Sequence, residues 1–125
     1  MATKKILIAE DDKFLSNAYR LKFTSSGYEV RTATNGQEAM DVLAEDFVPN
    51  VIIADLMMPI MDGYQFLKEL KLNNVTKDIP VIVTSNLSQP EDKEKSLKLG
   101  ADVFFVKSDS PINRIVEEAE KLIKT

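Results

Sequence analysis

The sequence predicts an α/β domain with a doubly wound, five-stranded parallel sheet and five helices. Short apolar runs alternate five times with longer segments of helical periodicity, and each right-handed crossover between parallel strands needs a helix on a sheet face. Most of these runs lack the polar alternation of a half-exposed strand, so helices should cover both of their faces. The length of 125 residues suits one domain with one core, which we expect to span residues 1–125.

The first strand and helix are predicted at the amino end. Residues 6–9 read Ile-Leu-Ile-Ala and run into three consecutive acids, Glu10, Asp11 and Asp12. A helix should follow, because apolar residues recur at helical spacing at Phe14, Ala18 and Leu21. Asp12 suits its N-cap, and Gly27 suits the position just after its end.

The second and third units place a central strand beside an edge strand. Tyr28–Ala33 alternates polar and apolar residues, as an edge strand does, and Asn35 then opens a helix that carries Ala39, Val42 and Leu43. Val51–Ala54 is apolar throughout and runs into Asp55, which is typical of a strand buried on both faces. Tyr64–Leu72 is predicted to be helical, with Leu67 and Leu70 facing inward.

The last two units complete the alternation. Pro80–Ser85 is a short buried strand with proline at its start, and Pro90–Leu99 is a polar helix closed by Gly100. Val103–Val106 should form the second edge of the sheet and ends in Lys107. Ser110 and Pro111 suit the N-cap and first position of a terminal helix, whose apolar face consists of Ile112, Ile115, Val116, Ala119, Leu122 and Ile123.

Composition excludes several kinds of chemistry. The chain has neither cysteine nor histidine, which removes disulfides, thiolate catalysis, and the commonest general base and transition-metal ligand. Any bound metal should therefore be a hard cation held by oxygens. The formal charge of −4 and the scattered lysines provide no basic stripe, so nucleic acid is not expected as a direct partner. No secretory signal or long apolar segment is visible, which predicts a cytoplasmic protein without a membrane partner.

Polar residues end four of the five predicted strands, at Glu10 and Asp11, Asp55, Thr84 and Lys107. The carboxyl ends of parallel strands meet at one edge, where open α/β folds bind ligands. Each residue has an ordinary structural explanation, such as capping, β-propensity or solvation. Capping, however, explains only one of three consecutive acids, and Asp55 follows four apolar residues without a local structural role. Three carboxylates and an ammonium group predict a Mg²⁺ site, with Asp55 as the candidate reactive group.

These residues resemble the receiver domain of bacterial two-component response regulators, over about residues 4–123. Ile6–Asp12 is similar to the acidic first-strand motif, Asp55–Gly63 to the phosphoacceptor loop, and Thr84 with Ser85 to the hydroxyl and small-residue pair. Further matches are Asn35–Ala39, Gly100–Asp102 and Lys107. The resemblance implies flavodoxin-like strand order 2-1-3-4-5. Because the sequence stops after the fifth helix, a stand-alone regulator of the chemotaxis type without an output domain is expected.

The resemblance implies phosphorelay signal transduction. Asp55 would accept a phosphoryl group from a sensor histidine kinase or phosphotransfer protein, with Thr84 and Lys107 contacting that group. Asp11 and Asp55 would ligate Mg²⁺ directly, Glu10 through water and Met57 through its backbone carbonyl. The chain would catalyse only its own phosphorylation and dephosphorylation, and so would not be an enzyme with a separate substrate. Since it has no histidine, the phosphoryl group must come from another protein or a small acyl phosphate.

The resemblance also implies a switch that acts through Thr84 and the aromatic residue three positions before the lysine, Phe104. Neighbouring phenylalanines on an edge strand point to opposite faces, which leaves one for such a role. Phosphorylation would then control contacts with a downstream target protein, in a monomer or a phosphorylation-dependent dimer. Ser108 replaces the usual cis proline, and a non-proline cis bond costs about 2.5–4 kcal/mol. We therefore expect a trans Lys107–Ser108 bond, with the flexible Lys107 side chain still reaching Asp55.

Three other functions have to be compared with this one. A pseudo-receiver would keep the fold as a constitutive protein-interaction module without phosphorylation, and the full set of acids, threonine and lysine argues against it. A flavin mononucleotide binder needs a phosphate-binding loop where this chain has three acids, which would repel phosphate. A haloacid-dehalogenase-type phosphatase has a second acid two residues after its nucleophile, where this chain has Met57.

Overall fold

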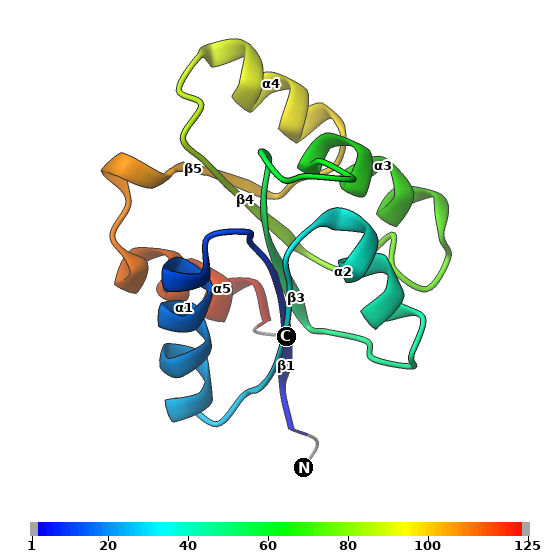
Figure 1. Ribbon diagram of the computed structural model, residues 1–125, viewed down its shortest axis with the longest axis vertical. Helices are drawn as coiled ribbons and strands as arrows, with labels where there is room; N and C mark the ends of the chain where they lie inside the picture. The colour runs from blue at the N-terminus through cyan, green and yellow to red at the C-terminus, as the bar shows by residue number, and fades with distance from the viewer. Residues whose placement is uncertain (1–2, 124–125) are drawn as a thin grey trace.

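The computed structural model describes residues 3–123 and confirms the predicted fold class. Five parallel strands pair in the order β2-β1-β3-β4-β5 (Figure 1). The strands are β1 (Lys5–Ala9), β2 (Glu29–Ala33), β3 (Val51–Asp55), β4 (Val81–Ser85) and β5 (Val103–Val106). The helices are α1 (Lys13–Ser25), α2 (Gly36–Leu43), α3 (Gly63–Leu72), α4 (Pro90–Lys98) and α5 (Ile112–Ile123). A short 3-10 helix, η1 (Lys107–Asp109), joins β5 to α5.

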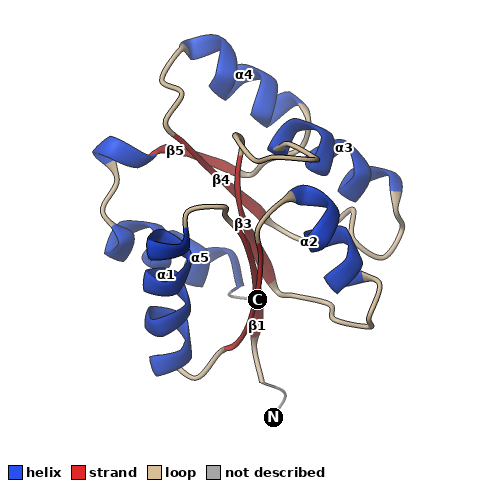
Figure 2. Ribbon diagram, in the orientation of Figure 1, coloured by secondary structure: helices blue, strands red, loops and turns tan. Residues whose placement is uncertain are grey.

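Helices cover both faces of the sheet, as Figure 2 shows. Helices α1 and α5 pack on one face, while α2 and α3, with α4 beside them, lie over the other. Successive strand residues point to opposite faces: in β1, Leu7 and Ala9 belong to the core under α2 and α3, whereas Ile6 and Ile8 belong to the core under α1 and α5. This alternation decides to which face the polar residues at the strand ends point.

The predicted helix starts and stops are confirmed within one or two residues. The Asp12 carboxylate caps α1 by accepting hydrogen bonds from the backbone N–H groups of Phe14 and Leu15, at 2.9 and 3.2 Å. Gly27 follows the end of α1 with φ of +91°, a conformation that glycine adopts without the strain of a side chain. Leu67 and Leu70 are buried in α3, as expected.

The buried face of α1 differs from the apolar pattern that predicted the helix. Phe14 is 91% exposed and Leu21 is also exposed, whereas Tyr19 and Phe23 are buried against the sheet. The N-cap at Asp12 fixes where the helix begins, and the packing against β1 and α5 then selects the stripe that includes Tyr19 and Phe23. The periodicity thus predicted the helix correctly, but the residues that carried it are not the buried ones.

Within residues 3–123, none of the helices combines the length and the apolar character that crossing a membrane requires.

Candidate functional site

Three polar side chains continue the strand rows that face α1 and α5. Glu10 follows Ile6 and Ile8 at the end of β1, Asp55 follows Val51 and Ile53 in β3, and Thr84 follows Ile82 in β4. Their exposures are only 2%, 4% and 0%. Since β1, β3 and β4 are neighbours, the three groups meet at the carboxyl edge of the sheet, as predicted. Burying two acids there is costly unless a positive charge compensates them.

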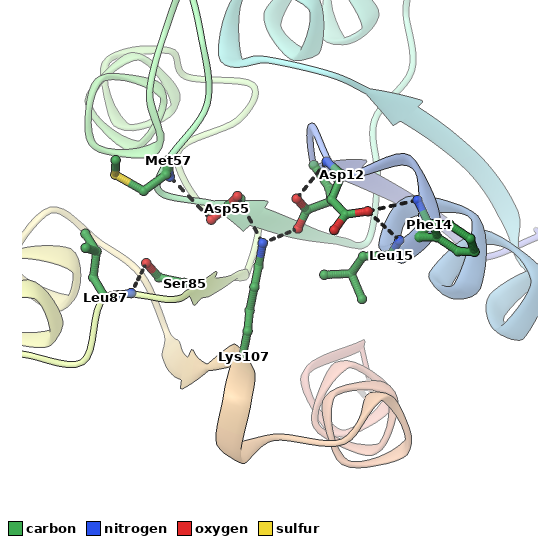
Figure 3. A network of polar contacts seen from close by, with 9 residues as sticks. Asp12, Phe14, Leu15, Asp55, Met57, Ser85, Leu87 and Lys107 are labelled. Carbon is green, nitrogen blue, oxygen red and sulfur yellow. Dashed lines mark hydrogen bonds and ion pairs between the residues drawn. The ribbon is translucent and has the colours of Figure 1, made fainter.

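Lys107 supplies that positive charge. Its Nζ lies 2.8 Å from Glu10 Oε1 and 3.1 Å from Asp55 Oδ2, so one ammonium group bridges both carboxylates. Figure 3 shows the side chain extended from the start of η1 toward Asp55. The described residues contain no cis peptide bond, so the Lys107–Ser108 peptide is trans, as predicted. The long stem of the lysine therefore reaches the site without the proline that is usual in similar proteins.

The charges of this cluster influence one another. Burial, and after it the charge of Asp55, raise the pKa of Glu10 to about 7 in spite of the contact with Lys107. Burial alone would lower the pKa of Lys107, but the contacts with Glu10 and then Asp55 raise it above its usual value. The lysine is therefore held in its charged form, and the acids repel each other in a way that a further cation would relieve.

The loop after β3 passes closely over Asp55. The backbone N–H of Met57 donates to Asp55 Oδ1 at 3.3 Å, and that of Gly63 donates to the Leu56 carbonyl at 2.9 Å. A Cβ atom at position 63 would lie 2.5 Å from the Asp55 carbonyl oxygen, so this approach requires glycine. Ile60, in the same loop, has φ of +69°, which is strained for a β-branched residue. Such strain is often found beside functional sites.

The acids of this edge can hold a metal ion. Carboxylate oxygens of Glu10, Asp11 and Asp55 lie within 4.8 Å of one another, with Asp11 exposed and the other two buried. Carboxylates that leave room for water ligands suit Mg²⁺ and similar hard cations. The predicted set of metal-binding acids is therefore brought together by the fold.

Other polar residues at this edge have structural partners. Asp62 Oδ1 accepts from the backbone N–H of Gln65 at 2.9 Å and caps α3, and Asn35 Oδ1 accepts from that of Glu38 at 2.8 Å and caps α2. Ser85 points to the opposite face from Thr84, and its hydroxyl accepts from the Leu87 N–H at 3.0 Å.

The two phenylalanines of β5 point to opposite faces, as predicted. Phe104 is half-buried against the core under α2 and α3, whereas Phe105 is buried in the core under α1 and α5. Phe105 pairs in register with Thr84, and Phe104 with the preceding residue of β4. The candidate switch residues Thr84 and Phe104 thus lie on adjacent strands.

Tyr19 is the residue near the site that the sequence reasoning missed. It is 1% exposed, and with Lys107 it lines a cavity of about 270 Å³ beside the start of α5. The spacing of Leu15, Tyr19 and Phe23, four residues apart, marks a second apolar stripe of α1 and could have identified it.

Comparisons with known proteins agree with this geometry. The family model for the response regulator receiver domain matches residues 6–120. Among curated proteins, the probable transcriptional regulator ycf27 of Porphyra purpurea is 33% identical over 125 residues, which cover 95% of this chain and 50% of that protein. The chain therefore spans about half the length of the curated relatives it matches.

Solved receiver structures have the same fold. The signal receiver domain of a histidine kinase from Syntrophus aciditrophicus is 33% identical, with a TM-score of 0.87 over 97% of this chain and 90% of that one. The phosphorylated cyanobacterial phytochrome response regulator RcpA is 29% identical, with a TM-score of 0.82 over 97% and 91%. The Mn(2+)-bound form of response regulator Rcp1 is 28% identical, with a TM-score of 0.80 over 95% and 91%.

These matches decide between the families considered from the sequence. A flavin mononucleotide binder and a haloacid-dehalogenase-type phosphatase are both excluded, because the receiver model covers nearly the whole chain. The chain belongs to the response regulator receiver domain family of two-component systems.

Proposed function

We propose that this chain is a phosphorelay receiver that accepts a phosphoryl group on Asp55 from a sensor histidine kinase or a phosphotransfer protein. Residues 1–125 act as one phosphoacceptor domain in the cytoplasm, and the phosphoryl group controls contacts with a downstream target protein. The only reactions that the chain catalyses are its own phosphorylation and dephosphorylation.

The position of Asp55 is the observation that carries this proposal. Its carboxylate is buried at the centre of the sheet edge, touches Lys107 and adjoins two further acids. A carboxylate oxygen of Asp55 attacks the phosphorus of a phosphohistidine, the P–N bond breaks with its electrons going to the imidazole nitrogen, and an acyl phosphate forms. Lys107 then stabilises negative charge on the transferred group, as a preorganised cation does in phosphoryl transfer.

The acidic cluster supports Mg²⁺ as the cofactor. Asp11 and Asp55 would hold it directly, Glu10 through water, and Met57 through its backbone carbonyl. When bound, the cation would supply positive charge against the negative charge of the transferred phosphoryl group. The carboxylate oxygens fit a hard divalent ion. The similar response regulator Rcp1 has been solved in a Mn(2+)-bound form, which supports a divalent metal as the cofactor.

The proposed test is phosphorylation by acetyl phosphate with Mg²⁺, followed by intact-mass spectrometry. We expect the mass of one phosphate on the wild type and none on Asp55→Asn. Asp62→Asn is the matched control, because it makes the same change at a helix cap of the same edge, where asparagine also caps well. Asp62→Asn should be labelled like the wild type. An unlabelled wild type would favour a pseudo-receiver, and full labelling of Asp55→Asn would place the phosphoryl group elsewhere.

Thr84 and Phe104 are proposed to couple the phosphoryl group to the surface formed by α4, β5 and α5. A phosphoryl group shifts a conformational equilibrium only by its different contacts in the two states, and the Thr84 hydroxyl is placed to make such a contact. With beryllofluoride and Mg²⁺ as a phosphoryl mimic, amide NMR shifts should extend over residues 86–107 in the wild type. They should shrink in Thr84→Ala. Wild-type shifts confined to the site would contradict this coupling.

A further inference from the structure

Helix α1 carries a buried tyrosine directly beneath the phosphoacceptor site. Tyr19 belongs to the core between the sheet, α1 and α5, together with Ile8, Ile53 and Ile82. The next side chains on the same face of those strands are Glu10, Asp55 and Thr84. The phenol ring therefore packs where the apolar core ends and the polar site begins.

Two buried hydroxyl groups at this boundary lack partners. Among residues 3–123, neither Tyr19 Oη nor Thr84 Oγ1 makes a hydrogen bond of good geometry, and both residues are almost completely buried. A buried polar group without a partner costs free energy, so this arrangement calls for an explanation. Thr84 pairs in register with Asp55, and the charges of Glu10 and Asp55 act on the Tyr19 phenol, so the reaction on Asp55 is an event that can give both hydroxyls partners.

Tyr19 is kept protonated and is therefore a hydrogen-bond donor. Burial raises its pKa, and the negative charges of Glu10 and then Asp55 raise it further. The Thr84 hydroxyl, which lies against the phenol without a hydrogen bond of good geometry, lowers it. Glu10, Asp55 and Thr84, the three groups at the strand ends, thus also act on the phenol of Tyr19. The nearby cavity of about 270 Å³, which Tyr19 lines with Lys107, gives the ring room to adjust.

We propose that Tyr19 is a positioning residue of the phosphoacceptor site and that it acts through Thr84. A hydroxyl group that donates its proton to a phosphoryl oxygen still has lone pairs to accept a hydrogen bond. When Thr84 turns its proton toward the phosphoryl group on Asp55, the Tyr19 hydroxyl donates to Thr84 Oγ1. The chain of hydrogen bonds then runs from Tyr19 to Thr84 to the phosphoryl oxygen, and each bond strengthens the next.

This inference rests on the proposed function, because it needs a phosphoryl group on Asp55. Thr84 and Lys107 contact the phosphoryl group directly, and neither belongs to α1. The inference adds that α1 stabilises the phosphorylated state from within the core. The hydrogen bond reaches good geometry only when Thr84 is engaged, so Tyr19 should favour the phosphorylated form without changing the metal affinity of the unmodified protein.

The test measures beryllofluoride affinity, in the presence of Mg²⁺, in a double-mutant cycle. Tyr19→Phe should weaken binding about three- to tenfold, as the loss of one hydrogen bond does. In a Thr84→Ala background, Tyr19→Phe should have no further effect, whereas in a Thr84→Ser background, which keeps the hydroxyl, the loss should reappear. Mg²⁺ affinity without beryllofluoride should be the same in Tyr19→Phe and the wild type.

Tyr28→Phe is the matched control. Tyr28 packs edge-on against Phe23 in the same core, with ring centroids 5.3 Å apart, but it lies at the far end of α1. The Tyr28→Phe variant should bind beryllofluoride like the wild type. Tyr19→Phe should also unfold at the same denaturant concentration as the wild type, because it removes a hydroxyl that has no partner.

The outcomes separate this inference from the proposed function. Wild-type affinity in Tyr19→Phe, or a loss that persists in Thr84→Ala, would overturn the role of Tyr19 while beryllofluoride binding that depends on Asp55 still supports the proposed function. A wild-type chain that binds no beryllofluoride, or binds it equally well as Asp55→Asn, would overturn the proposed function and the role of Tyr19 together.

Discussion

Two groups of polar side chains share the carboxyl edge of the sheet, and they differ in what they contact. The first group caps helices and consists of Asp12, Asn35 and Asp62, each of which accepts a backbone N–H of the following helix at 2.8–2.9 Å. The second group consists of Glu10, Asp11 and Asp55, whose oxygens converge on one another. No helix is capped by these three. The difference shows that helix capping, more than residue type, separates the structural side chains from the candidate functional ones.

The two groups should also differ in their effect on stability. A cap satisfies an N–H group that would otherwise lack a partner, so its removal destabilises the helix. Converging carboxylates repel one another, so removal of one should not destabilise the unliganded fold. Substitutions of the capping residues should therefore lower the free energy of unfolding, whereas substitutions of the converging acids should lower metal affinity.

Of the substitutions Asp11→Ala and Asp12→Ala, we expect the first to have the larger effect, and that effect should be on metal affinity. Substitution of a residue that only orients a metal ligand lowers metal affinity about 10- to 100-fold. Loss of a direct ligand should lower the affinity at least as much. We expect Mg²⁺ affinity, measured by NMR titration, to fall at least about tenfold with little change in stability, because the side chain is exposed. Unchanged affinity would mean that the metal binds elsewhere.

Asp12→Ala is the neighbouring change in the other group. It should lower the free energy of unfolding by about 1 kcal/mol, the usual cost of losing an N-cap, as measured by urea denaturation. Mg²⁺ affinity should stay close to that of the wild type. If Asp12→Ala instead weakened Mg²⁺ binding as strongly as Asp11→Ala, the distinction between caps and site acids would be wrong.

Helices α1 and α5 show what the sequence could and could not predict about the fold. In α5 the buried residues Ile115, Val116, Ala119 and Ile123 all belong to the predicted apolar face. Helix α1 has two apolar stripes, and the one with Tyr19 and Phe23 is buried, whereas Phe14 and Leu21 are exposed. Periodicity predicts that a helix forms, but where a helix has apolar residues on two sides, only packing against the sheet and α5 decides which side is buried.

The site was predictable as far as it depends on strand ends. Glu10, Asp55 and Thr84 follow apolar runs of parallel strands, and the register of those strands alone brings them together. The bridge from Lys107 to both acids depends on η1 and on a flexible side chain, and Tyr19 reaches the site from a helix. The spacing of its apolar stripe could have shown that Tyr19 faces inward, but neither its position near the site nor the bridge from Lys107 leaves a periodic signal in the sequence.

The most direct test of the proposed function asks which acid of this crowded edge carries the phosphoryl group. After treatment with acetyl phosphate and Mg²⁺, borohydride reduces an aspartyl phosphate to homoserine, and peptide mass spectrometry locates the altered residue. We predict homoserine at position 55 alone, because among the aspartates of residues 3–123 only Asp55 combines burial with a contact to Lys107 and a place in the acidic cluster. Homoserine at Asp11, Asp12 or Asp62, with Asp55 unchanged, would contradict this account.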